Sequence, residues 1–96
     1  MWLNYCAILK NVPNGMVITF PDVPGCFTCA FDRGEVDALA KEILSLTFHG
    51  HDRKDLPEAT PENEVDIDEG EEVVLVSVEM GEEDGVLKSL IPSELI

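Results

Sequence analysis

Two cysteines spaced C-x-x-C, Cys26 and Cys29, are the residues whose spacing most directly suggests chemistry. Such a pair is reactive at a helix N-terminus, where the thiol pKa falls, and it binds zinc in a tight turn when a second pair lies elsewhere. Here the composition of FPDVPGCFTCAF predicts a strand over residues 26–31, so an offset of three places the two side chains on opposite faces. Cys6 provides no second pair. We therefore expect structural cysteines, with neither a metal site nor a disulfide.

The two histidines offer a weaker alternative. His49 and His51 form an H-x-H pattern beside Asp52, and in an extended segment their side chains would share a face and bind zinc weakly. We expect them instead just after the end of a helix, where a cation is favourable beside the helix dipole.

The strands that must position these residues follow from the apolar pattern. Alternation over residues 3–10, the turn dipeptide Asn14-Gly15 and the run MVITF predict a β-hairpin over residues 3–20. The run 26–31 predicts a third strand. Residues 51–72 are polar and contain two prolines, which predicts a loop, and the following EVVLVSVEM, apolar on both faces, predicts a central strand.

A helix is predicted between the third strand and this loop. Asp32 and Glu35 fit a capping box at its start, and Gly50 marks its end. Its apolar side chains recur at the i, i+3, i+4, i+7 spacing of one helix face. These residues are Val36, Leu39, Ala40, Ile43, Leu44 and Thr47.

The order β-β-β-α-β predicts an α+β domain, with a mixed four-stranded sheet and one helix on one face. The right-handed crossover rule places the last strand at the centre, parallel to the first, and gives the strand order 3-2-1-4. We expect residues 1–80 to form this domain and residues 81–96 to form a C-terminal tail.

The same order is the first half of a ribonuclease H fold, which binds Mg²⁺ through converging carboxylates. The predicted first strand has no acid, which leaves Glu35, Asp37 and Glu79 without a partner there. No nucleophile motif or phosphate-binding loop marks another site. We therefore expect no catalytic residue, no metal and no cofactor, and we interpret the chain as not an enzyme.

Charge is the strongest bulk feature of the 96 residues. Six basic residues face twenty acidic ones, for a net charge of −14, and residues 61–96 carry Lys88 alone against twelve acids. Such a surface repels DNA and anionic membranes and attracts a basic protein, unless it only keeps the chain soluble. We expect no DNA binding and no membrane partner. Three cysteines without a secretion signal or a membrane span favour the cytoplasm.

The stretch GMVITFPDVPGCFT closely resembles the HicB family of antitoxins, which carry Gly-x-x-Val-x-Phe-Pro-Asp-Leu-Pro-Gly-Cys-x-Thr before their helix. Val23 replaces the leucine of that pattern. Departures lie at the helix start and at Leu39, and the similarity covers most of residues 3–80. The matching residues are Gly15, Val17, Phe20, Pro21, Asp22, Pro24, Gly25, Cys26 and Thr28.

The resemblance implies a partial ribonuclease H-like domain of a type II toxin–antitoxin system. It implies a function as well, in which the chain neutralises a small basic HicA-like ribonuclease toxin by covering its RNA-binding and active-site surface. The alternative is a stand-alone oligomerising or decoy module that has no toxin of its own. We expect the toxin contacts in the acidic loop, at Glu58, Glu62, Glu64, Asp66, Asp68 and Glu69.

The tail resembles part of a second domain. Residues 87–96, LKSLIPSELI, are similar to the opening strand of the ribbon-helix-helix DNA-binding domain that follows in many family members, and we expect this tail to be without that domain's helices. We expect the tail either to dock on its own domain or to pair with a second chain, and we favour pairing, which predicts a homo-oligomer. The expected oligomer contacts are Val86, Leu87, Leu90 and Ile91.

Overall fold

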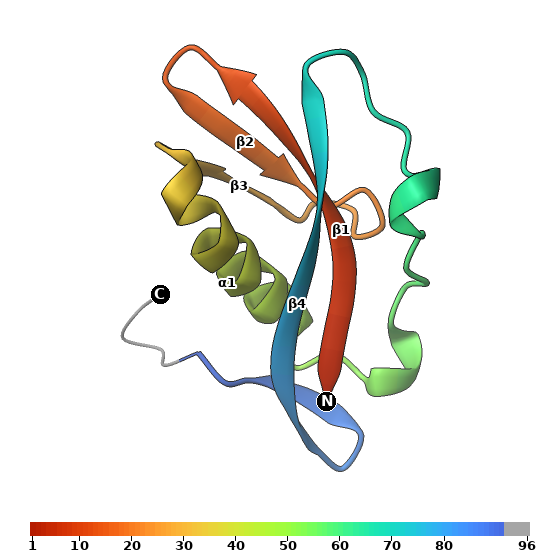
Figure 1. The fold of residues 1–96 in the computed structure, drawn as a ribbon. Helices are drawn as coiled ribbons and strands as arrows, with labels where there is room; N and C mark the ends of the chain where they lie inside the picture. Colours follow the sequence, from red (N-terminus) through yellow and green to blue (C-terminus); the bar gives the residue numbers. More distant parts are fainter. Residues whose placement is uncertain (92–96) are drawn as a thin grey trace.

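The computed structural model describes residues 1–91, in which one helix packs across one face of a curled antiparallel sheet (Figure 1). The strands are β1 (Trp2–Val12), β2 (Gly15–Thr19), β3 (Phe27–Ala30), β4 (Glu71–Glu83) and β5 (Val86–Ser89). The helix α1 (Val36–Phe48) follows the single turn η1 (Arg33–Glu35), and two further turns, η2 (Arg53–Asp55) and η3 (Glu62–Glu64), lie before β4. The sheet order is β3-β2-β1-β4-β5.

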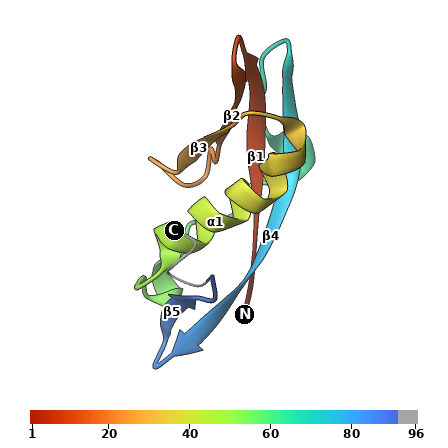
Figure 2. The same cartoon turned by 90° about the vertical axis from the view of Figure 1, so that its left-hand side faces the viewer.

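The core lies between α1 and the face of the sheet beneath it (Figure 2). Leu3, Tyr5, Ala7 and Leu9 alternate along β1 and are all buried on this face, as the period of two predicts. The ring of Tyr5 stacks on Phe48 at the end of α1, with ring centroids 5.6 Å apart. The predicted hairpin and helix face are therefore confirmed. The buried residues of α1 are Val36, Ala40, Leu44, Ser45 and Phe48.

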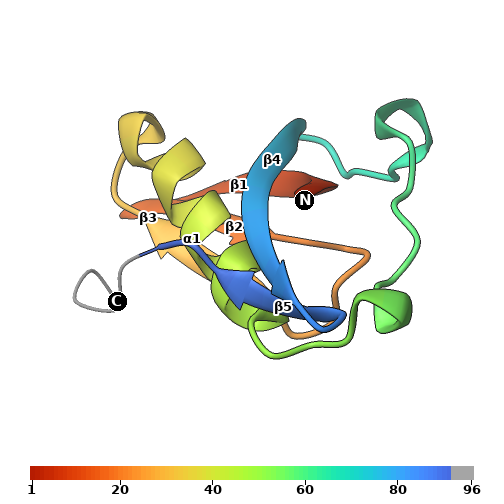
Figure 3. The same cartoon turned by 90° about the horizontal axis from the view of Figure 1, so that it is seen from below.

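The direction of β4 corrects the expected sheet. The strand pairs antiparallel with β1, from Lys10 opposite Glu71 to Trp2 opposite Glu79, and not parallel to it. The crossover rule does not apply to this pair, because it concerns parallel strands and the helix does not lead directly into β4. Residues 49–70 first carry the chain along the other side of the sheet, so that β4 enters at the far end of β1 and runs back (Figures 1 and 3).

The sheet also has a fifth strand, so it is neither four-stranded nor mixed. Residues 81–83, expected to begin the C-terminal tail, continue β4, and the turn itself contains only Asp84 and Gly85. β5 then pairs antiparallel with the last residues of β4. Its other edge lies against residues 50–53, where the Gly50 N–H donates to the Leu87 carbonyl and the Leu87 N–H donates to the His51 carbonyl.

Of the two expected outcomes for the tail, the structure therefore shows docking on its own domain. Leu87 is fully buried in the core, whereas Leu90 is 56% exposed. The expected similarity to a ribbon strand extends to residues 92–96, which lie outside the described part of the chain.

The start of the helix also differs from the prediction. Neither Asp32 nor Glu35 caps a backbone N–H with its side chain. The segment is held instead by Arg33, whose Nη1 donates to Glu72 Oε1 of β4 at 2.6 Å while Nη2 contacts the second carboxylate oxygen. This guanidinium lowers the pKa of Glu72.

Within residues 1–91 no helix is long and apolar enough to cross a membrane.

Candidate partner-binding surface

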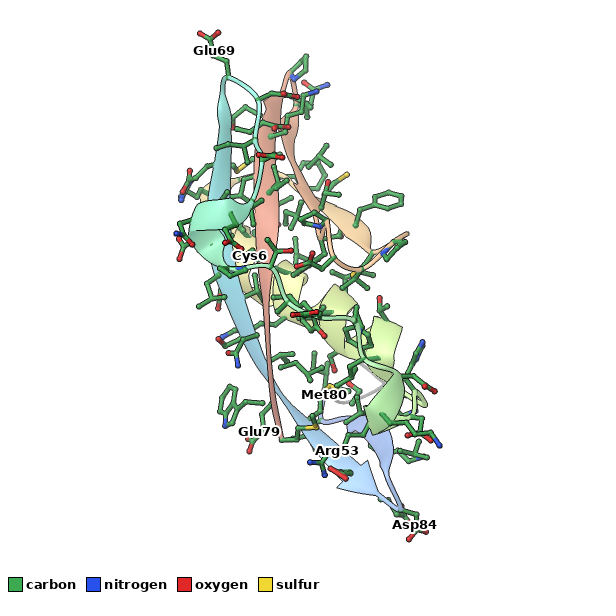
Figure 4. The ribbon with its side chains drawn as sticks, turned by 90° about the vertical axis from the view of Figure 1, so that its right-hand side faces the viewer. Cys6, Arg53, Glu69, Glu79, Met80 and Asp84 are labelled. Carbon is green, nitrogen blue, oxygen red and sulfur yellow. The ribbon has the colours of Figure 1, made fainter. Side chains whose placement is uncertain are left out.

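The acidic loop, residues 56–70, lies on the face of the sheet opposite α1, which we call the outer face (Figures 1 and 3). On β1 this face carries Trp2, Asn4, Cys6 and Ile8, and Trp2 is exposed while Cys6 is buried. Figure 4 looks onto the outer face and shows the loop passing over β1 near Cys6 before it turns into β4 beyond Glu69. The loop thus converts part of an open sheet face into an acidic surface.

Three contacts fix the loop to the sheet. The carboxylate of Asp22 accepts hydrogen bonds from the N–H and the hydroxyl of Thr60, both at 2.7 Å. The Tyr5 hydroxyl donates to the Pro57 carbonyl at 2.6 Å, and the Cys6 thiol lies 3.7 Å from the Thr60 carbonyl. Because charged acceptors make the stronger hydrogen bonds, the Asp22 pair is the main anchor.

Asp22 was not among the residues that charge and spacing singled out for a role. It lies in the stretch that resembles the HicB family, but its partner Thr60 is 38 positions away in sequence. The signal available was the unusual Pro-Asp-Val-Pro-Gly segment, in which an aspartate is held between two prolines. What it holds becomes visible only in the folded chain.

The six acids predicted to contact a toxin are all exposed and follow one another along this loop. Glu62 and Glu64 lie in η3, and Asp66, Asp68 and Glu69 continue to the start of β4. Two of them, Glu64 and Asp66, line a hollow of about 260 Å³ together with Asp22, Pro21, Thr60 and Val65. Glu58, Glu62, Asp68 and Glu69 do not line it. Each carboxylate is thus presented to solvent on a backbone that Asp22 holds in place.

The cysteines behave as structural residues. Cys26 is buried, Cys29 is exposed, and all three cysteines are free thiols. Burial raises the pKa of both Cys6 and Cys26, which disfavours the reactive thiolate. The predicted placement of Cys26 and Cys29 on opposite sides of the sheet is confirmed.

The histidines do not form a metal site either. His49 caps the C-terminus of α1, and its Nδ1 accepts the N–H of Ser89 at 2.9 Å, while the His51 ring packs edge-on against Phe48. Across residues 1–91 no group of three or more His, Cys, Asp or Glu side chains is arranged to hold a metal ion. Both histidines instead contact elements of the fold.

The predicted oligomer contacts are distributed between the core and the surface. Leu87 is buried within its own chain and Val86 is half-buried, so neither presents a free apolar side chain. Leu90 is exposed and Ile91 is half-buried. Association with a second chain through this segment stays a prediction, and it would have to use Leu90.

Replacing Asp22 by alanine is expected to release the loop. The change removes both hydrogen bonds to Thr60, and charge-assisted bonds of this kind contribute about 2 kcal/mol to the free energy of unfolding. Amide hydrogen exchange should accelerate at Thr60 and its neighbours, and urea unfolding should show the loss. Asp66→Ala, which removes an exposed acid from the same loop, is the matched control and should change stability by less than about 0.5 kcal/mol. Equal effects of the two variants would show that Asp22 is not the anchor.

Comparison with known proteins gives a likeness of fold and one likeness of sequence. No family model matches the chain. A curated relative, the uncharacterized 14.9 kDa protein in the rep-hol intergenic region of Haemophilus phage HP1 (strain HP1c1), is 36% identical over 59 residues. That match covers 59% of this chain and 44% of the relative, so the matched region is less than half of the relative's length.

Two solved structures have the same fold. A chain of the "HicA3 and HicB3 toxin-antitoxin complex" superposes with a TM-score of 0.65 and 18% identity, covering 80% of this chain and 99% of that one. A chain of a "Toxin-Antitoxin complex from Streptococcus pneumoniae" superposes with a TM-score of 0.69 and 16% identity, covering 99% of this chain and 84% of that one. The fold described above therefore occurs among the components of toxin–antitoxin complexes.

Proposed function

We propose that this chain is a HicB-like antitoxin, which binds a small basic HicA-like ribonuclease and neutralises it by covering the RNA-binding and active-site surface. The observation that carries the proposal is the acidic loop, whose carboxylates lie on a backbone fixed to the sheet by Asp22 and Tyr5. The fold shared with chains of two toxin–antitoxin complexes and the family resemblance of residues 15–28 support it.

The physical mechanism is competition for a basic surface. A ribonuclease binds RNA through positive charges that contact phosphates, and the exposed carboxylates of the anchored loop would pair with the same charges. Six acids lie between residues 58 and 69, and this stretch contains no lysine or arginine. Because Asp22 and Tyr5 already hold the backbone at Thr60 and Pro57, part of the ordering cost of the loop is met before the toxin binds.

The chain itself is proposed to have no catalytic activity. β1 carries no carboxylate, and Asp37 on α1 is paired with Lys41 at 3.0 Å. DNA binding is likewise not proposed for the described residues. Lys88 is the single positive charge after residue 60, and phosphate recognition needs several.

The second candidate is a stand-alone oligomerising or decoy module without a toxin of its own, which the exposed Leu90 favours. The genomic neighbourhood separates the two. An adjacent reading frame for a small basic protein that co-purifies with this chain supports the antitoxin, and its absence supports the module.

Neutralising three acids of the loop tests the proposed surface. The triple variant Glu62→Gln, Glu64→Gln, Asp66→Asn is expected to lower the association rate with the co-purified toxin several-fold and to weaken its salt dependence. Stopped-flow association at increasing salt measures both quantities. The dissociation rate should change less, because long-range attraction acts mainly before contact.

The matched control neutralises three acids elsewhere, Asp32→Asn, Glu42→Gln and Glu83→Gln, and gives the same net charge. Within residues 1–91 the side chains of these three acids form no ion pair. If both triple variants slow association equally, total charge and not the loop steers the toxin. If neither does, the contact is mainly apolar and lies on another surface.

A further inference from the structure

One edge of β4 is open over most of its length. The strand has thirteen residues, but β5 pairs only with Met80–Glu83, and β1 occupies the opposite edge. Within residues 1–91 no strand pairs with the remaining edge between Glu71 and Glu79. Figure 1 looks onto this edge, where β4 crosses the front of the molecule unobstructed, and Figures 2 and 4 both place β4 at the margin of the upper sheet.

The backbone groups that point outward can be assigned from the ladder. Met80 exchanges two hydrogen bonds with Met1, at 2.7 and 2.9 Å, so Met80 faces β1. In an antiparallel strand alternate residues face opposite neighbours. Both N–H and C=O therefore point away from β1 at Val73, Leu75, Ser77 and Glu79. The open stretch ends on both sides at residues whose backbone already has a partner. The Glu71 N–H donates to the Asp68 carbonyl, and Gly81 pairs with Lys88 of β5.

Between Val73 and Ser77 this edge has no proline, no charged residue and no bulge to prevent pairing with another chain. Edge strands are normally short, bulged, or interrupted by proline or lysine. The sequence from Val73 to Ser77 is VVLVS, and its register with β1 is continuous without a bulge. β3, which forms the other margin of the sheet, has only four residues. An unprotected edge in a protein of this net charge is therefore a feature to be explained.

The surroundings of the edge select its occupant. On the helix side a hollow of about 180 Å³ is lined by Val74, Val76, Val36 and Asp37, with Leu75 and Arg33 among its other residues. On the outer face Leu75 is 55% exposed. The strand carries five glutamates and no basic residue; Glu72 is paired with Arg33 and Glu82 with Arg53, and Glu71 and Glu79 flank the open stretch without an ion pair among the described residues. An added strand with apolar side chains toward the hollow and basic side chains at its ends would match both.

We propose that the open edge of β4, centred on Leu75, is the docking site for an extended basic segment of a partner protein, which adds a strand to the sheet. The proposal rests on the proposed function for the identity of the partner, and it adds the mode of binding. Main-chain hydrogen bonds from Val73, Leu75 and Ser77 would give the affinity, and the flanking glutamates would select positive charge.

A second copy of this chain is a poorer occupant. Antiparallel pairing of two β4 strands about Leu75 places Glu71 of one copy opposite Glu79 of the other, twice in the same contact. Like charges directly opposite on neighbouring strands are destabilising. Each copy also carries a net charge of −14.

Amide exchange and chemical shifts of the full chain test the edge. The probe is a capped peptide of alternating lysine and valine, and the control is the corresponding glutamate–valine peptide. The lysine peptide should shift and protect the amides of Val73, Leu75 and Ser77, and the glutamate peptide should leave them unchanged. Changes confined to the acidic loop, or no change with either peptide, would overturn the proposal.

Leu75→Pro provides the variant. It removes an outward N–H without removing a bond to β1, a position where an edge strand tolerates proline. Binding of the lysine peptide should weaken about tenfold or more, since a backbone bond is lost and the ring blocks close approach. Leu75→Ala keeps the N–H and should bind nearly as the natural chain does. Equal binding by the two variants would contradict strand addition.

The two proposals fail in different ways. If a co-purified toxin is inhibited while the amides of Val73, Leu75 and Ser77 exchange as in the free chain, the docking edge is wrong and the antitoxin function stands. If the lysine peptide protects these amides but no toxin is bound, the edge stands and the antitoxin function fails. If the free chain is a dimer that Leu75→Pro converts to a monomer, a second copy is the occupant and the proposal is wrong.

Discussion

Replacing Leu87 by alanine is expected to lower the free energy of unfolding by about 3 kcal/mol. Leu87 is fully buried, and truncating a buried leucine removes its transfer free energy and leaves a cavity. Its backbone also joins residues 50 and 51 to the sheet, so β5 closes the end of the core where α1 stops. The free energy of unfolding of a native domain is about 5–15 kcal/mol, so this loss is a large share of the total.

Leu90→Ala is the matched control, because Leu90 lies three residues further along the chain and is mostly exposed. We expect this change to cost less than about 0.5 kcal/mol. Equilibrium unfolding in urea measures both variants, and an unchanged slope with denaturant shows that the native and unfolded states are otherwise the same. A small effect at Leu87 would mean that β5 is held loosely and that the core ends at β4.

The strand β5 shows why the tail could not be placed from the sequence. The pattern from Val86 to Ile91 identifies a strand, but it does not identify the neighbour with which that strand pairs. That neighbour is partly the irregular segment 50–53, which has no strand periodicity of its own. Because two strands without a covered face are rarely stable, the tail needs a partner on its own domain or in a second chain, and the pattern does not show which. The hairpin turn at Asp84 and Gly85 provides the partner within the domain.

The direction of β4 is a different kind of error. Local periodicity predicts which residues form strands and which face is buried, so the hairpin, the helix face and the order β3-β2-β1-β4 were predictable. Strand direction depends on where the preceding connection delivers the chain. The crossover rule gives the handedness of a connection between parallel strands and does not decide whether β4 is parallel to β1. Residues 49–70 span the length of the sheet, anchored midway by Thr60, and so deliver the chain to the opposite end.

The candidate site divides in the same way. The acidic residues are visible in the sequence as composition, and the structure confirms that they are exposed. Two features depend on contacts between distant parts of the chain, namely the anchor at Asp22 and the open edge at Leu75. For the edge, the apolar run EVVLVSVEM predicted a central strand with both faces covered, whereas only the helix side is covered by α1 and Leu75 is exposed. An apolar run thus indicates burial, but it does not distinguish a core from a surface reserved for a partner.

Replacing Gly15 by alanine is expected to cost at least about 3 kcal/mol, by a mechanism separate from core packing. Gly15 begins β2 with φ +152°, which L residues rarely adopt, and an added Cβ would lie 2.3 Å from the Ala30 carbonyl oxygen. That oxygen belongs to the paired strand β3, where Ala30 lies opposite Met16 and cannot move away without breaking the ladder. Backbone strain and a clash with backbone atoms therefore add together.

Gly25→Ala separates these two contributions. Gly25 has φ +80°, also unfavourable for alanine, but an added Cβ there meets nothing within 4 Å. The control should cost about 1 kcal/mol from the backbone conformation alone, and the difference between the variants measures the contact with β3. Urea unfolding of both proteins checks this, and equal losses would contradict the contact. Both glycines belong to the stretch that resembles the HicB family, and Gly15 is its first residue. If the difference is found, that position needs glycine because β3 lies against it on the paired neighbouring strand.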